Sequence, residues 1–237
     1  MIEFITSHFN FIVYTFEILA LLVGLYFFNK TRCKSTRIFV FYLGYVVFVE
    51  LVAFSLMYLK STVLISYLIR IGIRTTSWFN LFWLYGSILF IIFYYHSLFF
   101  NLKFKLFLKI MAILFSMVML SHFIIFPKIF LTVHPPLYQI SGLIVTLFCV
   151  SLYFIEFLNG ENVFNIFRTL SFYVTIGLFV WWLIVSPVIF FNNYNTSADW
   201  DFANLKRRIF LFANIFMYTC FTVGFIISKP KSNNEII

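Results

Sequence analysis

Long apolar runs, separated by short polar segments, follow one another along the whole chain. Seven of them are long enough to cross a bilayer as helices: 8–28, 39–59, 78–100, 106–126, 137–158, 169–191 and 207–228. About 20 helical residues at ~1.5 Å rise cover the ~30 Å hydrocarbon core of a membrane. The pattern therefore predicts an all-α fold, a polytopic transmembrane helix bundle of seven spans, and we expect residues 1–237 to form a single bundle.

The composition leads to the same class of protein. Hydrophobic residues make up 63% of the chain and charged residues only 11%. A soluble domain with this balance would expose most of its apolar side chains to water. The first run has no basic segment before it and no small-residue cleavage site, which indicates a retained span rather than a cleaved signal peptide. We therefore expect a multi-pass protein in contact with the lipid bilayer.

The segment 62–75 between the second and third runs is ambiguous. Its polar residues Thr62, Ser66, Arg70 and Arg74 are four apart, so they form one stripe on a helix. This spacing favours an interfacial amphipathic helix whose arginines reach the headgroups. The alternative is an eighth span, which would reverse the orientation of every later helix. Two arginines in so short a segment argue against a crossing.

The net charge of +9 comes from lysines and arginines that lie in loops and near span ends. This distribution is typical of membrane topology and contact with anionic headgroups, and it predicts no nucleic-acid partner. The strongest basic cluster follows the first run and contains Lys30, Arg32, Lys34 and Arg37. Because such clusters stay on the cytoplasmic side, we expect the N-terminus outside and the C-terminus inside.

Two carboxylates lie within the first two runs. Glu17 is about as far from the start of its run as Glu50 is from the end of the next one. In an antiparallel pair of helices, both would lie roughly 13–14 Å from the same membrane face. An ionisable group at that depth costs at least ~2.5 kcal/mol and usually faces the interior of the bundle. We expect both to face protein, either as a functional site or as links between helices.

Several other polar residues are expected on the same outer side. Asn80 lies near the start of the third run, His122 near the end of the fourth and Gln139 near the start of the fifth. Arg70 and Arg74 are the nearest cations in sequence to Glu50. We hypothesise that one arginine points toward Glu50 or Glu17, and the alternative is that both bind outer phosphates. The candidate polar site therefore comprises Glu17, Glu50, Arg70, Arg74, Asn80, His122 and Gln139.

The sequence does not contain the patterns of several well-known chemistries. We find no phosphate-binding glycine loop, no zinc-protease motif and no nucleophile elbow. The cysteines Cys33, Cys149 and Cys220 are far apart, and the histidines have no metal spacing. We therefore predict no cofactor and no metal site, and an enzyme is the least favoured function because no nucleophile–base pair is visible.

Phenylalanine is unusually frequent, with 37 residues, and the first run continues as FEILALLVGLYFFNK from Phe16. In length, residue bias and runs of this kind, the chain resembles the Phe-rich seven-span inner-membrane proteins of the Bacteroidota type, a group without a known activity. The resemblance implies a bacterial inner membrane as the location. It covers the general plan and carries over no functional residue.

Two functional classes remain open. The first is a sensory or accessory membrane module that binds something on the outer side and acts through a membrane or cytoplasmic signalling partner. The second is a small proton- or cation-coupled transporter or channel that uses Glu17 and Glu50. Transporters often contain helices broken by Gly or Pro at the midplane. Here the glycines are scattered and Pro187 lies near a span end, so the module is favoured.

Overall fold

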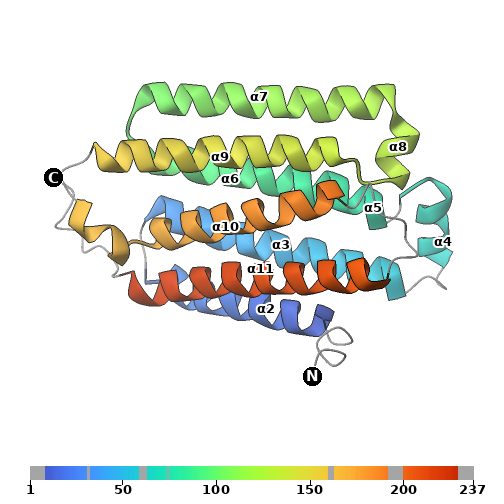
Figure 1. Cartoon of the computed structure of the whole chain (residues 1–237), viewed down its shortest axis with the longest axis horizontal. Coiled ribbons are helices and arrows are strands. Elements are labelled where there is room, and N and C mark those ends of the chain that lie inside the picture. The colour runs from blue at the N-terminus through green and yellow to red at the C-terminus, as the bar shows by residue number, and fades with distance from the viewer. Residues whose placement is uncertain are drawn as a thin grey trace. The chain divides into compact units, whose positions relative to one another are not determined.

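The computed structural model describes residues 9–30, 33–58, 63–73, 75–159, 163–191 and 200–228. Every regular element within these ranges is a helix (Figure 1). Seven helical segments in this part of the chain are long and apolar enough to cross a membrane. The protein is thus an all-α, multi-pass membrane protein. The number of spans that the sequence predicts is confirmed.

Six of these segments are single helices, and the third span joins three elements. The single helices are α2 (Phe9–Phe28), α3 (Lys34–Tyr58), α7 (Leu102–Ile125), α9 (Pro136–Leu158), α10 (Leu170–Phe191) and α11 (Trp200–Ile227). The third span runs through α5 (Thr75–Trp78), the π-helix η1 (Phe79–Gly86) and α6 (Ser87–Leu98). Three short elements connect the spans: α4 (Val63–Arg70), α8 (Pro127–Thr132) and the 3₁₀-helix η2 (Val163–Arg168).

Two spans begin earlier than the apolar runs indicate. Helix α3 begins at Lys34 rather than Phe39, and α11 begins at Trp200 rather than Arg207. Hydropathy detects only the part of a helix that lies in hydrocarbon, whereas the helix itself can continue into the headgroup region. The expected ends at His8 and Leu59 lie outside the described residues.

Local sequence signals explain several helix ends. The side chain of Asn101 accepts a hydrogen bond at 2.9 Å from the backbone N–H of Lys103 and so caps α7. Pro127 occupies the first turn of α8, where its missing N–H leaves no bond unmade. Gly72 has φ +90° after α4, and the N–H of Ile73 returns to the carbonyl of Leu68 at 3.0 Å. This left-handed glycine ends α4, which at eight residues is too short to cross a bilayer.

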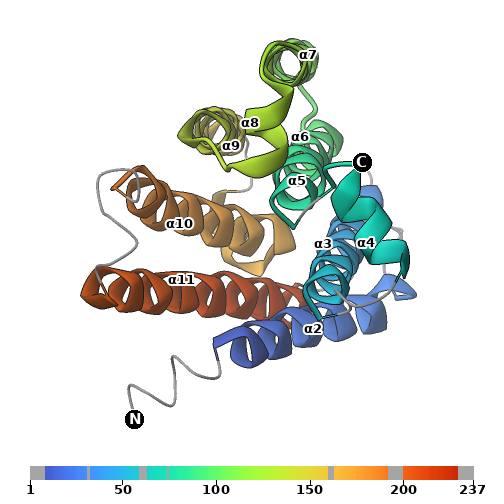
Figure 2. The ribbon, with the colours of Figure 1, turned by 90° about the vertical axis from the view of Figure 1, so that its right-hand side faces the viewer.

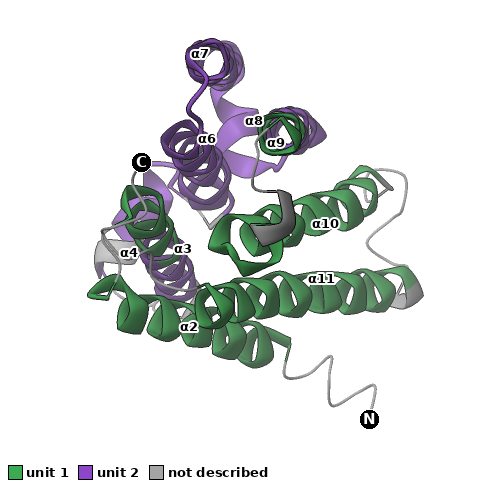
Figure 3. Cartoon of the chain, turned by 90° about the vertical axis from the view of Figure 1, so that its left-hand side faces the viewer, with its two compact units in different colours: residues 1–43, 150–237 green, residues 44–149 purple. Residues whose placement is uncertain are grey.

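The chain divides into two compact units (Figure 3). Unit 1 comprises residues 1–43 and 150–237, and unit 2 comprises residues 44–149. Both boundaries fall within spans, in α3 and α9. Each unit is therefore described by itself below.

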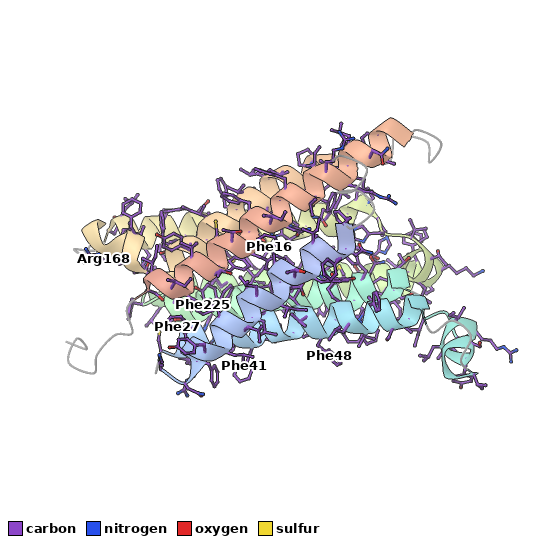
Figure 4. The ribbon with its side chains drawn as sticks, turned by 90° about the horizontal axis from the view of Figure 1, so that it is seen from below. Phe16, Phe27, Phe41, Phe48, Arg168 and Phe225 are labelled. Atoms are coloured by element: carbon purple, nitrogen blue, oxygen red, sulfur yellow. The ribbon has the colours of Figure 1, made fainter. Side chains whose placement is uncertain are left out.

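In unit 1, α11 lies against both α2 and α10 (Figure 2). Glycines let these helices approach closely. A Cβ at Gly24 would lie 3.1 Å from the ring of Phe225, and one at Gly224 would lie 2.8 Å from the Cβ of Tyr173. Phe27 of α2 and Phe225 of α11 stack with ring centroids 6.5 Å apart (Figure 4). Small residues at helix contacts are the usual means of tight packing in membranes.

In unit 2, the third span is held against α3 by two side-chain hydrogen bonds. Tyr45 Oη donates to the carbonyl oxygen of Phe82 at 2.6 Å, and Trp78 Nε1 donates to the carbonyl oxygen of Val49 at 3.2 Å. Phe82 belongs to η1, a π-helix of eight residues. Such segments are rare and frequently occur at functional sites. This unusual segment begins directly before Asn80, one of the candidate site residues.

Candidate functional site

Polar side chains gather at one end of unit 2, around the short helix α8. Asn80 comes from η1, His122 from the last turn of α7, His134 from the segment between α8 and α9, and Tyr138 from the first turns of α9. Ser77 joins them from α5. We call these five residues the α8 network. The turns at Pro127 and at Pro135–Pro136 bring its members together, because each proline favours the start of a helix.

Asn80 is the centre of the α8 network. Its side chain is completely buried, and its Nδ2 donates to the carbonyl oxygens of Phe130 and Val133, both at 2.8 Å. Its Oδ1 lies within hydrogen-bond distance of His134 Nδ1. One carboxamide therefore fixes both ends of the segment from α8 to His134. Residues 50 to 54 positions away from it in the sequence are held by this single side chain.

These bonds also define the protonation of His134. Both N–H groups of Asn80 face backbone carbonyls, which accept and cannot donate, so the oxygen of Asn80 must face His134. His134 Nδ1 therefore carries a hydrogen and donates it to Asn80 Oδ1. In the neutral imidazole, Nε2 is then the acceptor nitrogen.

Ser77 extends the same arrangement to the end of α4. Its Oγ lies 2.8 Å from the carbonyl oxygen of Leu131 in α8 and 3.1 Å from that of Gly72. One hydroxyl hydrogen is shared between these two acceptors. The start of the third span thus binds α8 through Ser77 as well as through Asn80.

Tyr138 lies between the two histidines of the α8 network. Its Oη is hydrogen bonded to His122 Nδ1, and its ring meets the ring of His122 edge-on at 5.0 Å between centroids. The rings of His134 and Phe130 lie 6.4 Å and 5.7 Å from it. Tyr138 is fully buried. The fourth span, α8 and the fifth span are therefore connected through this one side chain.

Gln139 follows Tyr138 and differs from its neighbours. It is only 2% exposed. Neither its Oε1 nor its Nε2 has a hydrogen-bond partner among the residues that the structure describes. A buried primary carboxamide offers two donors and an acceptor. In Asn80 these groups are bonded to the protein, whereas in Gln139 they are not.

The structure brings only some of the predicted site residues together. Asn80 and His122 are connected through His134 and Tyr138, and Gln139 adjoins Tyr138 in sequence. Glu50 is half-buried in unit 2, and Arg70 is exposed at the last residue of α4. Arg74 lies outside the described residues. An approach of either arginine to Glu50 or Glu17 stays a prediction.

Glu17 belongs to unit 1, where it is 2% exposed on the same side of α2 as the buried Ala20 and Gly24. Its side chain therefore faces protein. Because Glu50 belongs to unit 2, the expected matching height of the two carboxylates stays a prediction. Unit 1 also holds a partly buried polar pair in which Trp181 Nε1 donates to Asn214 Oδ1 at 2.8 Å.

Sequence reasoning overlooked Ser77, His134 and Tyr138, and it did not foresee the π-helix. His134 was considered only as a metal ligand, for which its isolated position gave no support. The one available signal was the Pro135–Pro136 pair, which places His134 directly before a helix and Tyr138 in its first turns. Among the described residues, no group of three or more His, Cys, Asp or Glu side chains is placed to hold a metal ion.

No protein-family model, curated protein or solved structure matches this chain. The function therefore has to be inferred from the residues themselves.

Proposed function

We propose that this integral membrane protein is a sensory or accessory module, in which α8 and the α8 network form the responsive part on the outer side. The observation that supports it is the double hydrogen bond from Asn80 to the carbonyl oxygens of Phe130 and Val133. The polar side chains at this end hold a short helical cap in place. In the proposed sensor, a ligand that competes for these bonds releases α8.

The strength of this attachment suits a switch. Asn80 contributes two hydrogen bonds to the cap and Ser77 a third. At about 0.5–1.5 kcal/mol net for each bond, the three contribute about 1.5–4.5 kcal/mol. A ligand needs a difference in affinity of ≈ 5.5 kcal/mol to reverse a two-state equilibrium from 1:99 to 99:1. Competition for these three bonds supplies between about a quarter and four fifths of that difference.

The signal would pass to a partner protein at the opposite membrane face. The region around the turn between α2 and α3 carries Lys30, Lys34 and Arg37, and the count of spans predicts that it faces the side opposite to α8. All three residues are exposed. Their positive charge attracts an acidic membrane or cytoplasmic signalling partner as well as anionic headgroups.

A proton- or cation-coupled transporter is the second candidate, and unit 1 contains the observations that favour it. Glu17 is buried within a span, and Pro187 lies inside α10. Proline has no N–H to donate to the carbonyl of Leu183, four residues earlier. A buried acid, together with a proline that removes one backbone hydrogen bond near the end of a span, is what favours a transporter in unit 1.

A protease experiment tests the proposed role of α8. Lys128 is exposed in α8, and trypsin cleaves there only when the helix opens locally. In nanodiscs, trypsin should cleave the Asn80→Leu variant at Lys128 faster than it cleaves the parent protein. Lys128→Gln should remove the fragment and so identify the site, while cleavage beside Lys34 serves as the internal control. An unchanged rate in Asn80→Leu would contradict the proposal.

Proteoliposomes distinguish the two candidate functions. The purified chain is reconstituted with a pH-sensitive dye inside the vesicles, and a proton or cation gradient is imposed. If the protein is a sensory or accessory module, the flux into the proteoliposomes should equal the leak rate of protein-free vesicles. A rapid flux that Glu17→Gln abolishes would establish the transporter instead, and Asn214→Leu provides a control for loss of a different buried polar group.

A further inference from the structure

Gln139 stands out among the buried polar residues at its end of unit 2. The donors and the acceptor of Asn80 are all used, and Tyr138 is paired with His122. Thr146, also on α9, donates to the carbonyl oxygen of Gly142 at 2.9 Å. By contrast, both polar atoms of the buried Gln139 side chain lack a hydrogen-bond partner within the described part of the chain.

An arrangement of this kind is unfavourable for the protein alone. Each buried polar group without a partner loses its hydrogen bonds to water and gains nothing in return, and the penalty is greater in hydrocarbon. A leucine of similar size would avoid the penalty altogether. A glutamine at this position is therefore explained best by a molecule that supplies the missing donor and acceptor.

The carboxamide defines the chemistry of such a molecule. Oε1 needs a donor and Nε2 needs an acceptor, and the two atoms lie side by side in one plane. A protonated carboxylic acid or another carboxamide offers the same two groups in the matching order. We infer that Gln139 binds the head of a neutral amphiphile that carries a carboxylic acid or a carboxamide.

The surroundings of Gln139 indicate that this molecule comes from the bilayer. Leu137, Ile140 and Ile144 of α9 are exposed apolar side chains close to it in sequence, on a helix that is long enough to span the membrane. At ~3.6 residues per turn, these residues lie on the exposed side of α9, and Gln139 lies on its buried side, about 100° around the helix from Ile140. An acyl chain can lie along the exposed side while the head passes beside α9 to reach Gln139. The ligand is thus a long-chain fatty acid or fatty amide, an inference that rests on the proposed function and names the ligand class of the same end of unit 2.

Photocrosslinking in nanodiscs tests the assignment directly. Oleic acid bearing a diazirine should label a peptide of α9 that includes Gln139. Excess oleic acid and excess oleamide should each suppress labelling, whereas methyl oleate, which lacks the donor, should not. Competition by oleic acid should weaken as pH rises, because its carboxylate has no proton to donate. Competition by oleamide should stay constant. Equal suppression by methyl oleate would overturn the inference.

Variants at Gln139 separate a ligand site from a structural bond. Gln139→Leu should weaken competition by oleic acid and oleamide by ~10-fold or more, the loss of about one good hydrogen bond. Without ligand, the same variant should raise the unfolding temperature by about 2–4 °C, because a buried group without a partner is removed. Thr146→Val, a matched change at another buried position of α9, should leave labelling unchanged.

A lower unfolding temperature in Gln139→Leu, with labelling intact, would show that Gln139 is only structural and overturn the inference. The proposed function fails by a different result, namely unchanged cleavage at Lys128 in Asn80→Leu. If cleavage responds to Asn80→Leu but no fatty acid or amide competes, the ligand class is wrong while the role of α8 stands.

Discussion

The phenol ring of Tyr45 occupies the space that a side chain at Gly86 would need. A Cβ at Gly86 would lie 2.7 Å from Tyr45 Cζ and still closer to its hydroxyl oxygen. From this position the hydroxyl donates to the carbonyl oxygen of Phe82, inside the π-helix η1. The glycine at the end of η1 therefore permits the bond by which α3 holds the third span, on which Asn80 also lies.

Gly86→Ala should destabilise the protein for this reason. The added methyl group forces Tyr45 to move and breaks its bond to Phe82, and overpacking of this kind typically costs about 1–3 kcal/mol. Thermal unfolding of the purified protein in detergent, followed by circular dichroism, measures the change.

The double variant Gly86→Ala/Tyr45→Leu provides the control. Once the phenol is absent, the methyl group has room, so the double variant should lose less stability than the sum of the two single variants. Strict additivity would show that Tyr45 and Gly86 do not oppose each other as the structure indicates.

Asn80→Asp should be more destabilising than Asn80→Leu. Leucine removes the hydrogen bonds to α8, whereas aspartate also places an oxygen against the carbonyl oxygens of Phe130 and Val133. We expect a difference of at least about 1 kcal/mol at neutral pH. Ser97→Ala is the matched control, because Ser97 only donates to the carbonyl of Tyr94 in its own helix. Equal losses for the Asp and Leu variants would contradict the donor role of Asn80.

Sequence reasoning was sound where a feature is local. Hydropathy found the seven spans, because each depends only on a run of apolar residues. The depth of Asn80, His122 and Gln139 was predicted in the same way from their distances to span ends, and it stays a prediction. Such distances place residues at one level of a bundle without showing which of them meet.

The features that were missed depend on long-range contacts. The role of α8 comes from bonds between Asn80 and residues beyond position 129, and no local pattern signals them. The π-helix is bonded to another span through Tyr45, which donates to the carbonyl oxygen of Phe82. The predicted matching height of Glu17 and Glu50 stays a prediction, because the two residues belong to different compact units.

Trp181 and Asn214 should be energetically coupled across α10 and α11. Their hydrogen bond measures 2.8 Å and joins two helices that pack along their length. Double-mutant cycles of hydrogen bonds within membranes average ≈ 0.6 kcal/mol and reach ≈ 1.7 kcal/mol, so Trp181→Phe and Asn214→Leu should couple within that range. Tyr153→Phe, which affects the bond to Ser171 instead, should add independently to Asn214→Leu. Coupling near zero for the first pair would contradict the bond.

Cys33 should react with thiol reagents at lower pH than an ordinary cysteine. Desolvation acts to raise the pKa of its thiol, but hydrogen bonds from the hydroxyl and backbone N–H groups of Ser35 and Thr36 outweigh it, so the pKa is lowered. More thiolate is then present at neutral pH, and the alkylation rate should reach half its maximum below the usual pH of about 8.5. Ser35→Ala should shift the profile to higher pH. A profile unaffected by this substitution would contradict the assignment.

The orientation of the chain and the number of its spans can be tested with two cysteines. With Cys149→Ala and Cys220→Ala as background, Cys33 reports on the segment before α3, and Lys128→Cys, combined with Cys33→Ala, reports on α8. The basic cluster around Cys33 favours the cytoplasmic side, and three spans separate it from α8. An impermeant maleimide should therefore label position 128 in intact cells and Cys33 only after permeabilisation. The opposite pattern would reverse the orientation. Labelling of both positions from one side would mean that the α4 segment crosses the membrane, contrary to its eight-residue length.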